Sequence, residues 1–290
     1  MQATNQSIHY RYDFLKYRKF AYAASLIFLT IGVVLYFTKG LVYHIDFAGG
    51  AELRINFEKP VDISVIRGAL GRDIRIQEVG NDQMDFILQV SSTDNSIEQE
   101  ILTSLKSSIK DNPVQISGVE MIGSEVGKDT KMNAVKAIAL ALLGLLIYIA
   151  IRSEFRFGVG ATIALMHDVV AALVFLTITR EPVSLHILAS ILAVLGYSIN
   201  DTIVIFSRIH ENMKKLRGAS EYDIVNLSIN QTLRRTILTS FATFLAVTAI
   251  LFLGGETLRG LSAVMLIGIV VGTYSSIYVA SAVMLAVGKK

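Results

Sequence analysis

The sequence contains no cysteine among its 290 residues. Disulfide bonds and thiolate metal sites are therefore excluded, and cysteine usage gives no information on the redox compartment. The five histidines are scattered, and the chain has neither an H-E-x-x-H pair nor a glycine-rich phosphate loop. Because no nucleophile–base arrangement emerges either, neither an enzyme with covalent chemistry nor a cofactor or metal is expected.

Basic side chains are scarce in one part of the chain. Residues 39–131 carry ten Lys and Arg against fifteen Asp and Glu, a net charge of −5. The whole chain carries +3, so the remainder carries +8. This asymmetry separates a soluble insert from a basic remainder and argues against a nucleic-acid-binding surface.

Apolar residues, by contrast, are abundant: 52% of the sequence is hydrophobic, and a mean hydropathy of +0.53 is far above that of an ordinary soluble domain. The first apolar run, 20–37, follows a basic segment and lacks a small-residue cleavage site, so it is interpreted as an uncleaved anchor. Five further runs approach the ~20 residues that cross a bilayer: 132–151, 157–178, 184–206, 236–254 and 260–287. The sequence predicts a polytopic α-helical membrane protein with six transmembrane helices.

Positive charge is concentrated on one side of these predicted spans. Basic residues cluster in the N-terminal segment, in the connection 207–235 and at the C-terminus, whereas the opposite short loops offer only Arg180 and Arg259. By the positive-inside rule, both termini are expected in the cytoplasm and residues 39–131 outside it. The sequence SEYD at 220–223 has the pattern of a capping box, which predicts a short amphipathic helix within a cytoplasmic loop 207–235.

We therefore expect three parts: residues 1–38 with the first helix, a domain at 39–131, and a five-helix bundle at 132–290. In the domain, apolar residues alternate as in strands at 53–57, 74–76, 84–90 and 114–121, and they recur with helical spacing at 63–70 and 97–109. Ser117-Gly118 suggests a bulge in the last strand. The order β-α-β-β-α-β is that of a ferredoxin-like fold. Because a fold does not give a function, both polypeptide binding and simple packing on a neighbour stay open.

Ionisable and polar residues fall at membrane depth in three of the predicted spans. His167 and Asp168 lie near the middle of the third span, Asn200 and Asp201 in the inner half of the fourth, and Arg235 at the inner end of the fifth. An ionised Asp at the centre of a membrane helix costs about 2.5–3.5 kcal/mol on insertion scales, so such residues usually face a bundle interior, a cavity or a partner charge.

Asp201 and Arg235 are expected at similar depth, because the fourth span runs inward and the fifth outward. Burial favours the neutral carboxylic acid and a nearby Arg favours the carboxylate, so moving the two apart changes proton affinity. The functional hypothesis is a protonation switch, and the alternative is a fixed ion pair that only neutralises a buried charge. For Asp168, which has no evident cation, a purely structural role is an equal alternative.

Small residues mark two helix faces. Gly268 and Gly272 form a GxxxG motif in the last span, and Ala189, Ala193 and Gly196 form a row in the fourth. Both patterns permit close helix approach. Packing within the chain is the expected role, and a dimer interface is the alternative.

Four motifs resemble, in order and spacing, those of the SecF subunits of the SecD/SecF protein-export family, in the RND superfamily. They are HIDFAGGAEL at 44–53, MHDVV at 166–170, LGYSINDTIVIFSRIHEN at 195–212 and QTLRRTILTS at 231–240. The resemblance covers nearly the whole chain. The chain departs from the family pattern at Ser207, where the family often has Asp, and residues 39–43 do not match a family motif. Neither difference involves the proton-site residues.

The resemblance assigns roles to the residues that match these motifs. It implies that Asp201 is the proton-site aspartate, preceded by Asn200, that Arg235 is the fifth-helix arginine, and that His167-Asp168 is the third-helix pair. Asp46, Gly49 and Gly50 match the signature at the start of the external domain, and their glycines suit a tight turn where the chain leaves the membrane.

The resemblance also implies partners and a location. The chain would be half of a pseudo-symmetric pair with SecD in the bacterial inner membrane, and it would use inward proton flow to help draw a preprotein from the SecYEG channel, with YajC as a further component. Protons would be the coupling ion. Two alternatives stay open: a non-coupling scaffold of the translocon, and half of an RND-type small-molecule exporter, against which the lack of an aromatic cluster in the insert argues mildly.

Overall fold

The computed structural model describes residues 9–71, 74–80, 82–94 and 96–288. The chain divides into two compact units. A helical unit comprises Met1–Leu41, Lys136–Glu181 and His186–Lys290, and an α/β unit comprises Val42–Val135 and Pro182–Leu185.

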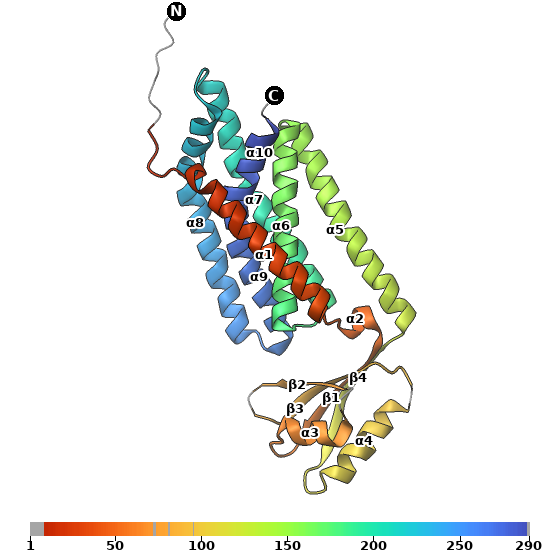
Figure 1. Ribbon diagram of the computed structural model, residues 1–290. Coiled ribbons are helices and arrows are strands. Elements are labelled where there is room, and N and C mark those ends of the chain that lie inside the picture. The colour runs from red at the N-terminus through yellow and green to blue at the C-terminus, as the bar shows by residue number, and fades with distance from the viewer. Residues whose placement is uncertain (1–8, 72–73, 81, 95, 289–290) are drawn as a thin grey trace, which may run out of the picture. The chain divides into compact units, whose positions relative to one another are not determined.

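The α/β unit has the strand and helix order predicted from the sequence. After the short helix α2 (Ile45–Ala48) follow β1 (Gly50–Phe57), α3 (Ile63–Leu70), β2 (Arg75–Val79), β3 (Asp85–Val90), α4 (Ile97–Ser108) and β4 (Val114–Ile122). The strands pair in the order β2-β3-β1-β4, and every neighbouring pair is antiparallel. Helices α3 and α4 lie on one side of the sheet (Figure 1). This arrangement confirms the predicted ferredoxin-like fold.

The core of the α/β unit forms where the alternating residues of the sheet meet the two helices. Leu53, Ile55 and Phe57 of β1 are almost completely buried, and Ile66 and Leu105 of the helices pack into the same cluster. The pairing of β1 with β4 slips between Arg54 and Ile55, which pair with Gly118 and Ile116. Ser117 is the extra residue, so the predicted bulge is confirmed.

Within the described residues, six helices are long and apolar enough to cross a membrane, as predicted. They are α1 (Arg18–Lys39, preceded by the short helix η1, Leu15–Tyr17), α5 (Ser124–Arg152), α6 (Phe155–Thr179), α7 (Leu185–Lys215), α8 (Glu221–Leu253) and the continuous run of α9 (Glu256–Tyr274), η2 (Ser275–Ala280) and α10 (Ser281–Val287). The segment η2 is a π-helical turn, in which the backbone is wound more widely than in an α-helix.

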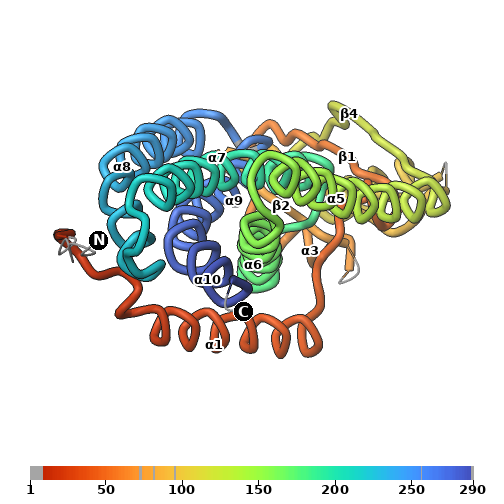
Figure 2. The backbone as a smooth tube through the Cα atoms, turned by 90° about the horizontal axis from the view of Figure 1, so that it is seen from above, coloured from red at the N-terminus to blue at the C-terminus, as the bar shows by residue number. Residues whose placement is uncertain are grey.

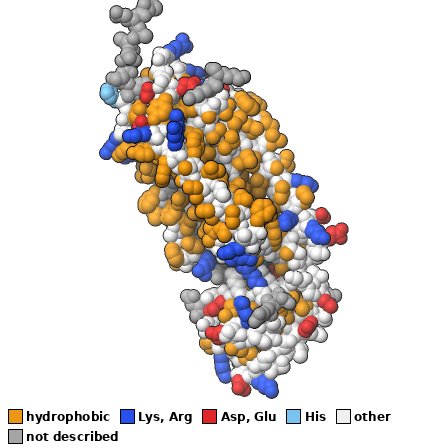
Figure 3. All heavy atoms as spheres, in the orientation of Figure 1, with side chains coloured by type: hydrophobic (Ala, Val, Ile, Leu, Met, Phe, Trp, Pro, Cys, Tyr) orange, Lys and Arg blue, Asp and Glu red, His pale blue; other side chains and the backbone are white. Residues whose placement is uncertain are grey.

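The helices differ in how deeply they lie in the bundle. About half of the most apolar window is buried in α6, α7 and the α9–α10 run, against 11% in α1, 6% in α5 and 17% in α8. Figure 2 shows α1 at one edge of the bundle, and Figure 3 shows hydrophobic side chains gathered over the helical unit on the face in view. The outer helices thus present apolar side chains suited to lipid or to another membrane helix.

Most of the connection 207–235, expected as a loop that contains one short helix, is helical. α7 continues to Lys215, and α8 begins at Glu221, where the Ser220 hydroxyl accepts a hydrogen bond from the Asp223 backbone N–H at 3.1 Å. Ser220 is therefore the N-cap residue that the capping-box pattern predicts, but it starts the long helix α8 and not a short one. The buried Asn212 amide donates to the Ser228 hydroxyl at 2.8 Å and joins the two polar helix ends.

The GxxxG motif packs within the chain as predicted. A Cβ atom on Gly268 would lie 2.2 Å from Val194, and one on Gly272 would lie 2.9 Å from the Cβ of Ser198, so α9 approaches α7 closely. For Gly196 the predicted packing is wrong, because no atom lies within 4 Å of its Cβ position. Gly196 lies on an exposed side of α7 together with Ala189 and Ala193, since residues three and four apart share a helix face.

Candidate functional site

The carboxylate of Asp201 is buried in the middle of the helical unit. Asp201 lies on α7 and is 3% exposed. Its Oδ2 accepts a hydrogen bond from the Ser240 hydroxyl of α8 at 3.2 Å, and that hydroxyl lies 2.8 Å from the Thr273 hydroxyl of α9. Because a hydroxyl both donates and accepts, this pair can serve Asp201 in its charged and in its neutral form.

Arg235 lies near Asp201 but does not touch it. It is on α8, where its side chain is exposed, and it attracts Asp201 electrostatically. Among the described side chains, no ion pair within 4.0 Å includes either residue. The two predicted partners are therefore neighbours that do not form the fixed ion pair considered as the alternative to a protonation switch.

Two cavities lie on α8 near the Asp201 site. One of about 400 Å³ lies between α7 and α8, with Ser207, Glu211 and Arg235 in its wall. The other, of about 270 Å³, lies between α8 and α9, with Ser240 and Thr273 in its wall. The hydroxyl pair thus reaches one cavity, and Arg235 lines the other.

A second buried carboxylate belongs to Asp168 on α6, which is 1% exposed. Its Oδ2 accepts hydrogen bonds from the Ser198 hydroxyl of α7 at 2.6 Å and from the Ser275 hydroxyl at the start of η2 at 2.9 Å. The His167 Nδ1 lies 3.4 Å from the other oxygen. The predicted His167-Asp168 pair therefore lies inside the bundle, with its charge partly offset by hydroxyl dipoles.

Further buried hydroxyls, which the sequence does not mark, lie on α7 and η2 close to the two carboxylates. Ser198 lies one turn before Asp201 on α7, and the Thr202 hydroxyl next to Asp201 lies 2.9 Å from that of Ser276 in η2. π-helical turns are rare and frequent at functional sites. The sequence does show Ser and Thr residues in the middle of the predicted spans. It does not show which residues on other helices they contact. In the described part of the chain, no group of three or more His, Asp or Glu is arranged to hold a metal ion.

Asn200 is separated from the buried site. Its side chain is exposed on α7, on the same side as Gly196, because neighbouring residues on a helix point about 100° apart. No hydrogen bond within the described chain satisfies its amide. The Asn200 amide is therefore open to a polar group from outside the described chain.

The external signature residues lie together in the α/β unit. The His44 Nδ1 lies 3.1 Å from Asp46, and its Nε2 lies 2.8 Å from Glu52 of β1. The same Asp46 oxygen, Oδ2, also accepts a hydrogen bond from the Leu185 backbone N–H, at 2.9 Å. Asp46 therefore joins the signature to residue 185, which belongs to the same α/β unit.

The signature glycines have backbone conformations and neighbours that exclude a side chain. Gly49 has φ +74°, and a Cβ there would lie 2.6 Å from the Ser124 Cα; Gly50 has φ +131°, and its Cβ would lie 2.2 Å from the Val90 carbonyl oxygen. The predicted turn at these glycines is therefore confirmed.

Stability of the α/β unit should depend on pH through His44. Burial disfavours the charged imidazolium, but Asp46 and Glu52 outweigh it and raise the pKa of His44 from 6.5 to about 9. The His44 hydrogen bond holds the pKa of Glu52 below its ordinary value. The His44 contribution is fully present below pH 6.5 and is lost as the pH rises through about 9, whereas the Glu52 contribution is lost only in acid.

We expect His44→Gln to lower the stability of this unit by about 3 kcal/mol near neutral pH or below, and by much less above pH 9. Hydrogen exchange of β1 in the full chain, corrected for the intrinsic pH dependence, measures the difference. Parallel wild-type and variant curves from pH 6 to 10 would contradict the assignment.

Comparison with known proteins gives consistent matches. The family model described as "Protein export membrane protein SecD/SecF, C-terminal" matches residues 101–290. The chain is 37% identical to "Protein translocase subunit SecF" of Pseudomonas aeruginosa, over 94% of this chain and 90% of that protein. It is 36% identical to the subunit of the same name from Escherichia coli O157:H7, over 96% of this chain and 88% of that one.

Solved structures agree with these relatives. A crystal structure of SecDF from Thermus thermophilus, described as a translocon-associated membrane protein, matches with a TM-score of 0.86 at 33% identity and covers 100% of this chain. The chain spans only 40% of the length of that SecDF chain. A second SecDF structure, in a super-membrane-facing form, matches with a TM-score of 0.69 at 32% identity. From sequence, family and fold together, the chain belongs to the SecD/SecF family of protein-export membrane proteins, as a SecF protein translocase subunit.

Proposed function

We propose that this subunit, paired with SecD, uses inward proton flow to promote a late stage of preprotein translocation through the SecYEG channel, with YajC as a further component. The observation that carries the proposal is the state of Asp201: a buried carboxylate held by hydroxyls, with Arg235 nearby but not in contact. A carboxylate held in this way can gain and lose a proton without breaking a direct ion pair.

The cavity between α7 and α8 supports an approach for the proton, because its wall carries Ser207, Glu211 and Arg235. A proton would reach Asp201 from this side, while Arg235 supplies the compensating charge. The cavity between α8 and α9 is apolar apart from Ser240 and Thr273, so it is not part of this route. One charge that crosses the membrane potential carries about 2.3 kcal/mol per 100 mV, so a few protons are enough to bias a conformational equilibrium strongly.

A pairing with SecD would cover the exposed side of α7 that carries Gly196 and the Asn200 amide. Asn200 and Gly196 lie on that side without a partner within the described chain. The chain also spans 40% of a SecDF chain, which leaves room for a second half.

The test is preprotein export into vesicles that contain the translocase with or without this subunit and its SecD partner. Under the proposal, the subunit pair adds a late export step that an uncoupler removes. Stimulation that persists when the proton gradient is dissipated would favour a non-coupling scaffold. Binding of a small hydrophobic molecule, but not of an unfolded preprotein, would favour an exporter half.

A further inference from the structure

A third cavity lies between α5 and α7, and it shares Ile203, Ser207 and Glu211 with the wall of the cavity between α7 and α8. Its volume is about 470 Å³, within the range of small-molecule sites. One part of its wall is apolar or aromatic, with Tyr148, Ile203 and Phe206. The other part carries Arg152, His210 and Lys214. The cavity therefore joins an apolar wall to a cationic end.

The two permanent cations of this cavity differ from their neighbours in lacking an acidic partner. Arg152 and Lys214 make no ion pair within the described chain. Nearby Arg156 pairs with Glu154 and Glu221 at 2.9 and 2.8 Å. The positive charge of Arg152 and Lys214 is thus available to a ligand.

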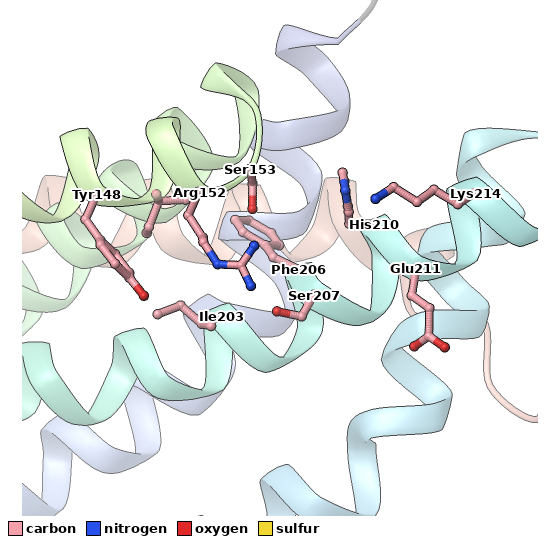
Figure 4. A pocket seen from close by; sticks show the side chains of 10 residues that line it. Tyr148, Arg152, Ser153, Ile203, Phe206, Ser207, His210, Glu211 and Lys214 are labelled. Atoms are coloured by element: carbon pink, nitrogen blue, oxygen red, sulfur yellow. The ribbon is translucent and has the colours of Figure 1, made fainter.

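The carboxylate that lines the same cavity does not offset these two cations. Glu211 is held by Arg208 and Lys215, at 2.6 Å from each. Figure 4 shows Arg152 reaching from the end of α5 toward Ser207, whereas the Glu211 carboxylate points away from both Arg152 and Lys214. The cavity end between α5 and α7 is therefore net positive and has a hydroxyl donor beside the guanidinium.

The place of this cavity along the predicted spans indicates which kind of anion it binds. Arg152 ends a predicted span, and Tyr148, one turn earlier, is 56% exposed on the apolar side of α5. By the charge distribution, this end of the spans faces the cytoplasm. Basic pockets between membrane helices on that side bind phospholipid headgroups. A lipid would place its phosphate between Arg152 and Lys214 and its chains along Tyr148 and Ile203.

We propose that this cavity is a binding site for an anionic phospholipid of the cytoplasmic leaflet, with Arg152 and Lys214 as the phosphate ligands. Arg152 and Lys214 do not line the cavity that carries Arg235, and lipid binding is measured without a proton gradient, so its failure is distinguishable from failure of the proposed function.

The test uses the purified full chain in a neutral detergent, titrated with dioleoyl phosphatidylglycerol and followed by native mass spectrometry. We expect one saturable lipid, and about a 30-fold loss of affinity in the Arg152→Gln, Lys214→Gln double variant, because each cation near an anionic lipid contributes about fivefold. The charge-preserving Arg152→Lys variant should keep affinity within a few-fold, which separates charge from folding.

The matched control is the Lys19→Gln, Arg234→Gln double variant, which removes the same charge from exposed positions outside the cavity. It should bind within about threefold of wild type. Equal loss in the control, equal binding of dioleoyl phosphatidylcholine, or the absence of a saturable lipid would overturn the proposal. Displacement of the lipid by millimolar inorganic phosphate would also overturn it and would indicate a site for a soluble anion.

Discussion

Replacing Asp201 with Asn should abolish the proton-gradient-dependent part of preprotein export while the chain still inserts and assembles. Asn has almost the same size as Asp and can still accept the hydrogen bond from Ser240, so packing is retained. It cannot exchange a proton at neutral pH, so no charge cycles at α7. We expect the stimulation by the gradient to fall at least tenfold in vesicles that contain the SecD partner.

Two further variants decide how this result is interpreted. Arg235→Met should remove the same stimulation, because the compensating charge is lost. Asp129→Asn, which removes one exposed carboxylate of the α/β unit, should leave it unchanged. If Asp201→Asn supports full stimulation at normal subunit levels, Asp201 is a structural residue and the scaffold becomes the better explanation.

Placing a single methyl group on Gly50 should unfold or severely loosen the α/β unit. The Ala side chain would lie 2.2 Å from the Val90 carbonyl oxygen at φ +131°, and the obstructing atom belongs to the backbone of the paired strand β3. Left-handed strain and overpacking together predict a loss of about 2–5 kcal/mol. Protease resistance of residues 42–135 in the full chain, measured against urea concentration, reports this loss.

Gly80→Ala provides the matched control in the same unit. Gly80 also has a positive φ, +83°, but no atom lies within 4 Å of its Cβ position. Its substitution should therefore cost only the conformational strain, about 1 kcal/mol. A Gly50 variant as stable as the Gly80 variant would show that β1 and β3 can move apart at low cost.

Apolar runs and the alternation of apolar with polar residues predict most of the fold, because both patterns depend directly on which side chains are buried. The spans stand out as apolar runs, and Leu53, Ile55 and Phe57 alternate because one side of β1 faces the helices. The helical ends of α7 and α8 escape prediction because polar residues such as Asn212 are paired there by tertiary hydrogen bonds. The π-helical turn at 275–280 has no local signal, since its backbone depends on packing.

The candidate site is predictable in its charges but not in its connections. A carboxylate in a membrane helix is conspicuous, so Asp168 and Asp201 are found from sequence alone. Ser240 and Ser275 are ordinary mid-span residues until tertiary packing sets them against those carboxylates. The motif also does not show that its two adjacent residues have different surroundings: Asn200 is exposed, whereas Asp201 is buried.

The exposed amide of Asn200 has a consequence for the supply of this subunit in the cell. A copy without a partner keeps a polar group against lipid, at a cost of about 1–3 kcal/mol when no hydrogen bond compensates. A bound partner that satisfies the amide removes this cost. Copies made in excess of such a partner are then the less stable population, by the free energy that this one amide contributes.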